Sequence, residues 1–461
     1  LISFLIILIS YLLLGLNTSS NKFSWVKSLF DNKQKQLIMK YVFPYKFISI
    51  QEKKILQGKK HLEQKNYVLD FMMPRFLKME SELKKSGASI NLSKKDQLNL
   101  KKDYILKKYS INDGFYIGIN NKFPGSGYID FYQKKLLILS SRGVLTYGNL
   151  NNLEDETIFK QIKNNIDEFI DIDEYFKERR LSIKDLSIIK DEIYISYSEE
   201  IKKNCWTTSI IFGKLSFDNI KFEKLFSPGQ CVNSLNEDNE FNPVQAGGRI
   251  IEFDSNHILF SIGDYRLRHL SQNKKSIFGK IIKINTENKK FEILSMGHRN
   301  PQGLLYDKEN NFIISTEHGP RGGDEINIID IESIYKNEEI LNFGWAISSY
   351  GEHYGEKKQN KTKYEKYPLY KSHSKHGFIE PIKSFVPSIG IAENVKIGDN
   401  KYVLSSMRDR SIYFFNLDQE KNIINFDRVE VFERVRDLKF HDNKLYLFME
   451  DTASIGIIDL I

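Results

Sequence analysis

A repeated pair of apolar runs constrains the fold of this chain more than any other feature. Each copy has one apolar run, a polar turn containing Asp, Asn or Lys, and a second apolar run that usually ends in Ser. Six copies are present, and their second runs end at positions 140, 196, 261, 315, 405 and 449. Most intervals are about 45 to 65 residues, the range in which repeated all-β units form propeller blades. The repeat therefore predicts an all-β fold, a six-bladed β-propeller.

Composition agrees with that fold and limits the kinds of binding partner that we expect. With 461 residues, 41% of them hydrophobic, the chain can bury ordinary cores and is not disordered by composition. No helical pattern separates the apolar runs, which argues against a doubly wound α/β fold. The net charge is +8, but Lys and acidic residues alternate along most of the chain. Because no basic stripe or binding motif accompanies this charge, we expect no nucleic-acid partner.

The region before the repeats predicts two further parts. Residues 1–16 are apolar throughout, so 1–20 is predicted to be a signal anchor or a cleaved signal peptide, with a buried core segment as the alternative. Residues 62–85 and 94–108 are rich in Lys, Glu and Leu at helical spacing, which predicts a helical membrane-proximal segment over 21–112. The propeller is then expected over 113–461. This arrangement predicts a membrane-anchored or exported protein whose bulk is extracytoplasmic, in the periplasm.

Cys205 and Cys231 are the two cysteines of the chain. They lie on either side of a predicted strand pair, and an exported protein would meet conditions that allow a disulfide. A bridge and two unpaired thiols are both compatible with the sequence.

Two loops joined by one apolar run have the composition of a binding site. They cover residues 297–303 (GHRNPQG) and 317–327 (EHGPRGGDEIN). Gly and Pro let the backbone approach a ligand closely, and the interleaved Arg, Asn and Gln side chains offer directed hydrogen-bond donors. A polar excursion over 348–383 follows, which could form a wall over the pocket or a solvated loop.

These loops, together with Asn342-Phe343-Gly344-Trp345, resemble the soluble glucose/sorbosone dehydrogenases. Further resemblance is found in Arg434-Val435-Arg436-Asp437, in Val386-Pro387-Ser388 and in two strands around Arg249 and Asp264. The resemblance is good over 240–461, faint over 113–240 and absent before 113. It implies a six-bladed propeller that uses pyrroloquinoline quinone (PQQ) and calcium, with a small-molecule sugar or alcohol as substrate and an external electron acceptor.

The resemblance also implies roles for particular residues. PQQ is a planar tricarboxylate, which calls for cations and is best served by planar guanidinium groups. Arg299 would face the reactive carbonyl, with Asn300 and Gln302 donating to neighbouring oxygens. Arg434 and Arg436, which lie two residues apart on one face of a strand, would bind carboxylates of PQQ. Arg408, which stands where the family usually has Lys, would bind another.

Calcium would be held by oxygen atoms of the second loop. The resemblance places the backbone carbonyls of Gly319 and Pro320 on the calcium that polarises the quinone, and hard oxygen ligands suit that ion. Asp324, Glu325 and the Phe343 carbonyl would form a second, structural calcium site. For the two acidic residues the alternative is a turn whose backbone amides they cap.

One catalytic position departs from the family pattern. Gln245 stands four residues before Arg249, where the family has a His that acts as the general base. Gln cannot accept a proton near neutral pH, and loss of a general base costs on the order of 10² to 10⁴ in rate. His298 and His318 are expected to be structural hydrogen-bonding groups rather than a relocated base.

Two functions follow from these observations. The first is a quinoprotein oxidoreductase that oxidises an aldose sugar or a related alcohol. The second is a catalytically altered propeller that binds a ligand or partner without sugar oxidation. A lactonase-type hydrolase is a third alternative, but it would need a calcium held by carboxylates at the channel floor, and the sequence does not display that set. The retained arginines favour the first function, and the absent His favours the second.

Overall fold

The computed structural model describes residues 32–42, 89–111, 126–149, 156–170, 182–336, 339–354 and 361–460, with scattered residues between 48 and 62. The chain divides into two compact units, Leu1–Met79 and Glu80–Ile461. In the first unit, helix α3 covers Asn32–Val42. The predicted anchor over 1–20 and most of the predicted helical segment lie outside the described residues. None of the described helices combines the length and the apolar character that crossing a bilayer would require.

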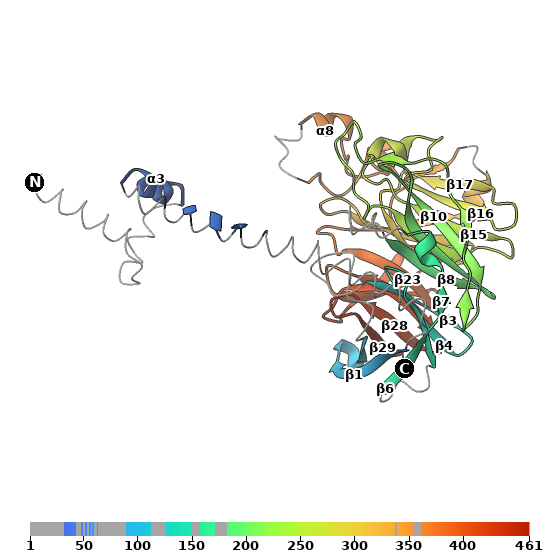
Figure 1. Cartoon of the computed structure of the whole chain (residues 1–461). Helices are drawn as coiled ribbons and strands as arrows, with labels where there is room; N and C mark the ends of the chain where they lie inside the picture. The colour runs from blue at the N-terminus through green and yellow to red at the C-terminus, as the bar shows by residue number, and fades with distance from the viewer. Residues whose placement is uncertain are drawn as a thin grey trace, which may run out of the picture. The chain divides into compact units, whose positions relative to one another are not determined.

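The second unit is a β-propeller, and its described strands form six blades (Figure 1). Each of the first three blades begins with its innermost strand. Blade 1 contains β3 (Gly127–Tyr132), β4 (Lys135–Ser140), β5 (Leu145–Asn149) and β6 (Glu156–Gln161); blade 2 contains β8 (Ile183–Ile189), β9 (Glu192–Lys202), β10 (Cys205–Lys214), β12 (Glu223–Phe226) and β13 (Val232–Asn233); blade 3 contains β14 (Gly247–Glu252), β15 (His257–Ile262), β16 (Lys280–Asn285), β17 (Phe291–Met296) and β21 (Leu341–Asn342).

The later blades follow the same plan. A short parallel pair, β7 (Lys163–Asn164) with β11 (Asn219–Ile220), lies outside the six blades. Short helices α7 (Ile331–Lys336) and α8 (Lys361–Lys366) and 3-10 turns at 101–103, 166–168, 268–272 and 374–376 connect the strands. Blade 4 contains β18 (Pro301–Asp307), β19 (Phe312–Glu317), β20 (Asp324–Asp330) and β22 (Lys383–Phe385); blade 5 contains β23 (Ile391–Gly398), β24 (Lys401–Ser406), β25 (Ser411–Leu417) and β26 (Ile423–Glu430); blade 6 contains β27 (Val435–His441), β28 (Lys444–Met449) and β29 (Ser454–Asp459).

The predicted six-bladed propeller is confirmed, and each sequence repeat is the inner half of one blade. The two apolar runs of each copy are the innermost strand and its neighbour, from β3 with β4 through to β27 with β28. The runs read as nearly continuous apolar segments because both faces of these strands are covered by neighbouring blades. In β4, for example, Leu136 to Leu139 are all fully buried.

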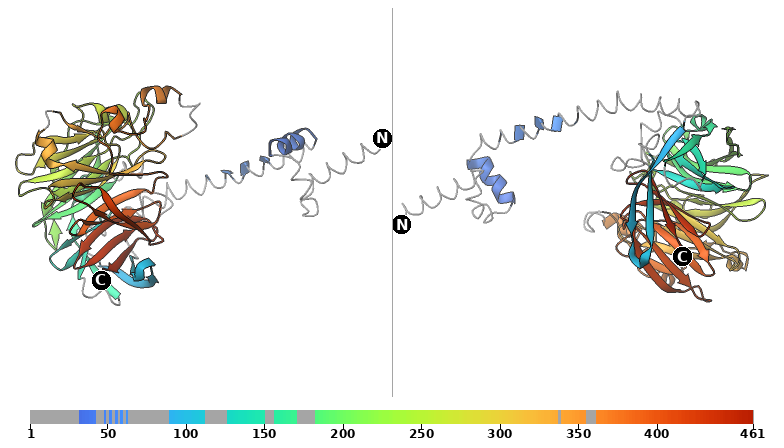
Figure 2. Two further views of the ribbon diagram at one scale, coloured as in Figure 1. Left: turned by 180° about the vertical axis from the view of Figure 1, so that it is seen from behind. Right: turned by 90° about the horizontal axis from the view of Figure 1, so that it is seen from below.

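The ring is closed by a strand from the N-terminal side, β2 (Ile105–Ile111). It pairs antiparallel with β29 and completes blade 6. Strand β1 (Ser89–Asn99) then pairs with both β2 and β6, so one continuous sheet joins blades 6 and 1. Figures 1 and 2 show β1 beside the C-terminal strands.

These two strands correct the sequence interpretation, which placed a helix over 94–108 and began the propeller at 113. The segment contains Lys and other polar residues because β1 and β2 are outer strands with solvent on part of their surface, and several β1 side chains, including Leu98, are exposed. Leu92, Leu106 and Ile111 point inward and are buried. A short strand pair of this kind gives no long alternating pattern, so its Leu spacing resembled that of a helix.

Cys205 and Cys231 are joined by a disulfide, with their Cα atoms 5.3 Å apart. The bridge ties the first residue of β10 to the residue before β13, and β10 also pairs with β13 through Cys205 and Trp206. The alternative of two unpaired thiols is therefore excluded.

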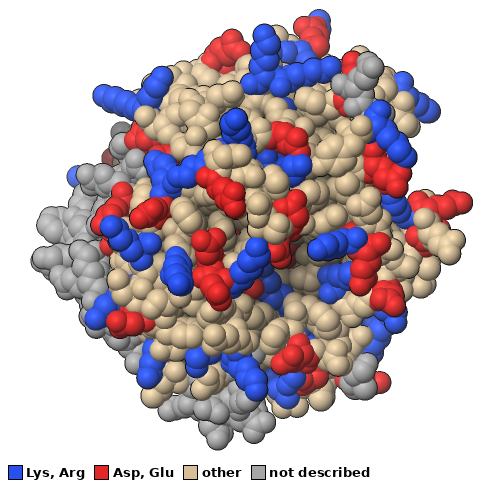
Figure 3. Space-filling model, turned by 90° about the vertical axis from the view of Figure 1, so that its right-hand side faces the viewer, with Lys and Arg blue, Asp and Glu red and all other residues tan. Residues whose placement is uncertain are grey.

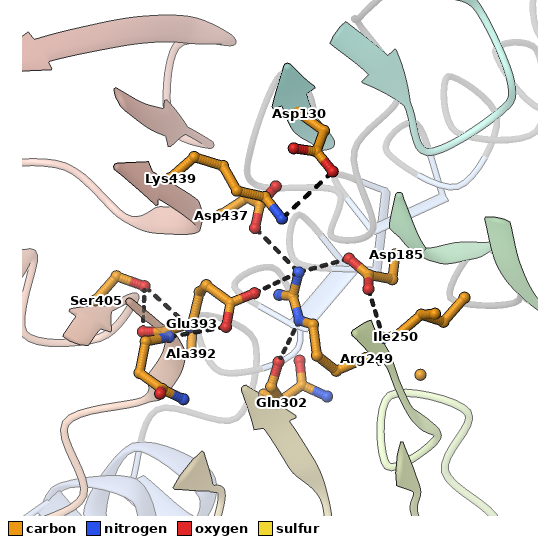
Figure 4. Close-up of polar contacts among 12 residues, drawn as sticks. Asp130, Asp185, Arg249, Ile250, Gln302, Ala392, Glu393, Ser405, Asp437 and Lys439 are labelled. Carbon is orange, nitrogen blue, oxygen red and sulfur yellow. Dashed lines mark hydrogen bonds and ion pairs between the residues drawn. The ribbon is translucent and has the colours of Figure 1, made fainter. Parts of the chain in front are cut away.

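An ionic cluster lies at the centre of the ring, where the six innermost strands approach one another (Figure 4). The Arg249 guanidinium from β14 pairs with Asp185 of β8 (2.5 Å), Glu393 of β23 (2.5 Å) and Asp437 of β27 (3.1 Å). Its Nε donates to the Gln302 carbonyl of β18 at 3.0 Å. One side chain therefore links five blades, and a Lys439–Asp130 ion pair links blade 6 to blade 1 at 3.8 Å.

Burial changes the protonation of this axial cluster. It raises the pKa of Asp185 to about 7 and that of Glu393 to about 8, although the Arg249 charge opposes both shifts. The surface differs from this interior, because Lys and Arg intermix with Asp and Glu over the face shown in Figure 3. That face carries no single-sign patch.

Candidate active site

A cavity of about 270 Å³ lies at one end of the innermost strands. Several of its lining residues lie just before an innermost strand: Asn300 directly precedes β18, Arg434 directly precedes β27, and Gln245 lies two residues before β14 begins. The propeller thus brings together residues that are far apart in sequence. The sequence-predicted residues that line the cavity are Gln245, Arg299, Asn300, Gly319, Pro320, Asp324, Arg408 and Arg434.

Arg299 is held by contacts on several sides. Its guanidinium donates to the His318 carbonyl at 2.8 Å and lies over the Trp345 ring, 5.4 Å from the ring centroid. When the Gln245 amide is oriented to satisfy both of its ends, its oxygen accepts from Arg299 at 2.8 Å and its nitrogen donates to Asp264 at 3.0 Å. Gln245 therefore bridges a buried cation and a buried carboxylate.

Asp264 lies behind these residues and fixes their positions. Its second oxygen accepts from the Trp345 indole at 2.7 Å, and the Arg266 amide donates to the first at 2.7 Å. Burial raises the pKa of Asp264 above its ordinary value, and the Arg299 charge opposes that shift. The sequence interpretation used Asp264 only as part of a family motif and did not identify this contact role.

Arg434 and Arg436 converge on one carboxylate. Arg434 Nε donates to one oxygen of Glu450 at 2.8 Å, and an Arg436 Nη donates to the other at 2.8 Å. Burial alone would raise the pKa of Glu450, but the two guanidinium groups hold it below its ordinary value. Arg408 differs from this pair, because it is exposed and its guanidinium has no hydrogen bond or ion pair with any described residue.

Gln302 and Asn300 form a linked pair of amides. The Gln302 side chain donates to Asn300 Oδ1 at 3.0 Å, and the same oxygen accepts from the Gly247 amide at 3.1 Å. Gln302 does not line the cavity, but its hydrogen bond holds the side chain of Asn300, which does.

The second loop is braced by Asp324. Its carboxylate accepts from the backbone amides of Gly319 (3.1 Å), Gly390 (2.7 Å) and Ile391 (3.2 Å). This is the arrangement of the alternative interpretation, in which an acidic residue caps turn amides. A side chain at position 319 would collide with the Gly323 carbonyl, so the tight turn requires glycine there.

Glu325 and the Phe343 carbonyl both contact His373, a residue that the sequence interpretation missed. His373 Nδ1 lies 2.8 Å from the Phe343 oxygen, and Nε2 lies 3.2 Å from Glu325. The Glu325 carboxylate raises the pKa of His373 against the opposing effect of burial. Among the described residues no group of three or more His, Cys, Asp and Glu side chains is arranged to hold a metal ion.

The two motif histidines lie in different surroundings. His298 is fully buried, with Nε2 2.8 Å from the Ser295 hydroxyl and Nδ1 3.2 Å from Glu317. His318 lines the cavity, and burial together with the Arg299 charge lowers its pKa.

Part of the 348–383 excursion lines the cavity through Tyr354. Ion pairs hold the excursion to the loop before blade 3, since Lys363 pairs with Glu240 at 2.5 Å and Lys366 with Asp238 at 2.8 Å. Tyr354 therefore contributes to the wall of the cavity. Sequence reasoning assigned no role to six other lining residues. Arg321 and Ser388 lie inside the motifs named above, and the other four belong to loops without a recognisable motif: Asn242, Val244, Gly390 and Met407.

Comparison with known proteins identifies a family whose sequences match this chain. The model of the glucose/sorbosone dehydrogenase family matches residues 189–458. The chain is 28% identical over 175 residues to the aldose sugar dehydrogenase YliI of Escherichia coli (strain K12), covering 35% of this chain and 44% of that protein. It is 27% identical over 223 residues to the protein slr1608 of Synechocystis sp., covering 42% and 50%. The chain thus matches about half the length of these curated relatives or less.

Solved structures share the fold. A glucose dehydrogenase superposes with a TM-score of 0.56 at 18% identity, covering 73% of this chain and 96% of that one. The PQQ-bound aldose sugar dehydrogenase of Streptomyces coelicolor superposes with a TM-score of 0.52 at 15% identity, covering 73% and 99%. The family match extends over more than half of the sequence, and the chain belongs to the glucose/sorbosone dehydrogenase family.

Proposed function

We propose that this protein is a quinoprotein oxidoreductase that oxidises an aldose sugar or a related alcohol with PQQ. The observation that carries the proposal is the gathering of Arg299, Arg408 and Arg434 around one cavity. A planar tricarboxylate needs such a set of cations, and guanidinium groups match carboxylates in shape and charge. Family membership supports the same cofactor, since a protein of this fold was solved with PQQ bound.

The side chains take complementary roles in this proposal. Arg408, Arg434 and Arg436 would hold the carboxylates, and the Asn300–Gln302 pair would donate to neighbouring oxygens. Arg299 would stabilise negative charge at the reacting carbonyl, and its contacts with Gln245 and the His318 carbonyl already fix its position. When bound, PQQ supplies the two-electron oxidant.

Calcium fits one of the two proposed positions. Gly319 and Pro320 line the cavity, and their backbone carbonyls would offer the hard oxygen atoms that calcium prefers. The second position fits poorly, because three backbone amides occupy the Asp324 carboxylate, and His373 contacts both Glu325 and the Phe343 carbonyl.

We further propose that Gln245 stands where relatives have a catalytic His. Its amide is neutral and cannot take the proton of a sugar hydroxyl, so turnover is expected to be slow. This observation favours the second candidate function, a catalytically altered propeller that binds a ligand or partner without oxidising sugar. Anchoring through residues 1–20, a periplasmic location and an external electron acceptor stay predictions.

Titration of the protein with PQQ and calcium, followed by absorption, tests the proposal. Aldoses are then added with a redox dye. Saturable PQQ binding with dye reduction supports the oxidoreductase. Bound PQQ that no sugar reduces selects the altered propeller, and absence of PQQ binding contradicts the oxidoreductase and the cofactor pocket together.

A further inference from the structure

We propose that the substrate of this cavity is an anionic sugar, an aldose that carries a carboxylate or a phosphate, and that Arg321 recognises the charged group. The inference rests on the proposed function, because it names the substrate class of the same site. It starts from the state of the arginines that line the cavity.

Two of these arginines are already engaged within the protein. Arg299 donates to the His318 carbonyl, and Arg434 donates to Glu450. Arg321 is exposed, and its guanidinium makes no hydrogen bond or ion pair with the described part of the chain. Five N–H donors at the cavity are therefore available to a ligand.

The backbone of Arg321 is fixed, although its guanidinium contacts no polar group of the described residues. Its amide donates to the Glu352 carbonyl at 2.9 Å, and the Glu352 amide donates back to the Arg321 carbonyl at 2.9 Å. Arg321 thus lies where the second site loop meets the first part of the 348–383 excursion. A guanidinium on an anchored backbone loses less conformational freedom on binding a ligand than one on a mobile loop.

The charges around the cavity favour an anion beyond the cofactor. Asp324 is the only carboxylate among the described lining residues, and backbone amides occupy both of its oxygens. The proposed function assigns Arg408, Arg434 and Arg436 to the carboxylates of PQQ, and of these Arg408 and Arg434 line the cavity. Arg321 lies outside that set, and its guanidinium has no charged partner among the described residues.

A carboxylate or phosphate on the sugar would satisfy this charge. The guanidinium fork matches both groups and can bind either through two parallel hydrogen bonds. A neutral aldose would leave Arg321 without a charged partner. The inference therefore distinguishes acidic from neutral sugars and leaves the choice between carboxylate and phosphate to experiment.

The test compares glucose, glucuronate and glucose 6-phosphate with the wild type and with Arg321→Gln and Arg321→Lys. Calorimetry measures binding to the protein without PQQ, and dye reduction measures kcat and KM after PQQ loading. We expect an acidic sugar to bind at least about tenfold more tightly than glucose, with Arg321→Gln removing most of that preference and Arg321→Lys restoring part of it. The change should fall on KM rather than kcat and should weaken as salt rises. The acid that is preferred identifies carboxylate or phosphate as the recognised group.

Arg410→Gln is the matched control, because Arg410 is also exposed but does not line the cavity. It should leave the preference unchanged. Equal binding of glucose and both acids overturns the inference, as does an Arg321→Gln variant that keeps the wild-type preference. Weaker PQQ binding by Arg321→Gln assigns Arg321 to the cofactor and also overturns it. Failure of the proposed function can be distinguished from failure of this inference. If the wild type does not bind PQQ, the proposed function is wrong, and the calorimetry without PQQ still decides the role of Arg321.

Discussion

Gln245 shows how one neutral side chain can complete a network that also limits the chemistry of its site. Its amide accepts from Arg299 and donates to Asp264, so a cation and a carboxylate are both satisfied without a titratable group between them. An imidazole at the same position would meet the same two neighbours. Asp264 could then accept from one ring nitrogen and leave the other able to take a proton.

Gln245→His is therefore expected to raise the turnover of aldoses by about 10² to 10⁴. Dye-linked assays of the PQQ-loaded variant measure the gain, and Gln245→Asn serves as a control that changes size without adding a base. A histidine variant that binds PQQ yet turns over no faster than the wild type would show that the missing base does not limit the reaction.

Glu450→Gln removes the negative charge that Arg434 and Arg436 share in a buried position. Because the buried Arg436 and the half-buried Arg434 then lose this shared anion, we expect a loss of about 3 kcal/mol in the free energy of unfolding. The native pKa of Glu450 is depressed, so its stabilisation is complete above the unfolded pKa, for which 4.5 is the reference value, and is lost as pH falls through the lower native pKa. Urea titrations at pH 7 and pH 3 measure both effects, and a difference between the two proteins that grows on acidification would contradict the prediction.

Motif residues could be located from sequence, whereas their partners could not. Arg299, Asn300 and Arg434 lie at the cavity as the motifs indicated. Glu450 and His373 were missed because each contacts residues from a different stretch of the chain, and no local pattern marks such a partner. Asp324 was assigned to calcium, but its contacts with backbone amides depend on a loop 66 residues away.

At the scale of elements, the disulfide is the clearest constraint on one blade. It closes a loop with a sequence separation of 26 residues between β10 and β13. In the chain-entropy account, such a loop stabilises the native state by about 3 kcal/mol.

The double variant Cys205→Ser, Cys231→Ser should lose about that free energy of unfolding while keeping the fold. Chemical denaturation measures the loss, and reduction of the wild type with a thiol should reproduce it. A variant as stable as the oxidised wild type would show that the bridge contributes nothing beyond the β10–β13 pairing.

Inner strands were predictable as elements, and outer strands were not. The inner pairs are apolar on both faces, which gives a signal strong enough to count blades. Strands β1 and β2 expose part of their surface and carry lysines, so their pattern resembled a surface helix. Their place in the sheet is set by pairing with β29 and β6, which are distant in sequence.

For the molecule as a whole, the axial cluster links all six blades and makes stability depend on pH. Asp185 and Glu393 have native pKa values of about 7 and about 8, above the ordinary values of free carboxyl groups. Raised values mean that the folded protein holds these protons more tightly than the unfolded chain. The contribution of Asp185 and Glu393 to the free energy of unfolding is thus complete below their pKa values in the unfolded chain. It is lost as pH rises through 7 to 8.

Glu393→Gln should flatten this dependence. The amide can still face Arg249 but no longer ionises, so we expect the free energy of unfolding of the variant to fall less than that of the wild type between pH 5 and pH 9. Denaturant titrations across that range measure the two curves. Parallel curves would exclude Glu393 as a source of the pH dependence.

The closing strand has a consequence for synthesis on the ribosome. Blade 6 needs β2, made early, and β29, made about 350 residues later, so the ring cannot close until nearly the whole propeller has been translated. Until then the edges of β2 and β28 lack β29, the strand with which both finally pair, and unpaired strand edges of this kind favour aggregation. A premature stop that removes only β29 should therefore yield an open, aggregation-prone product rather than a five-bladed one.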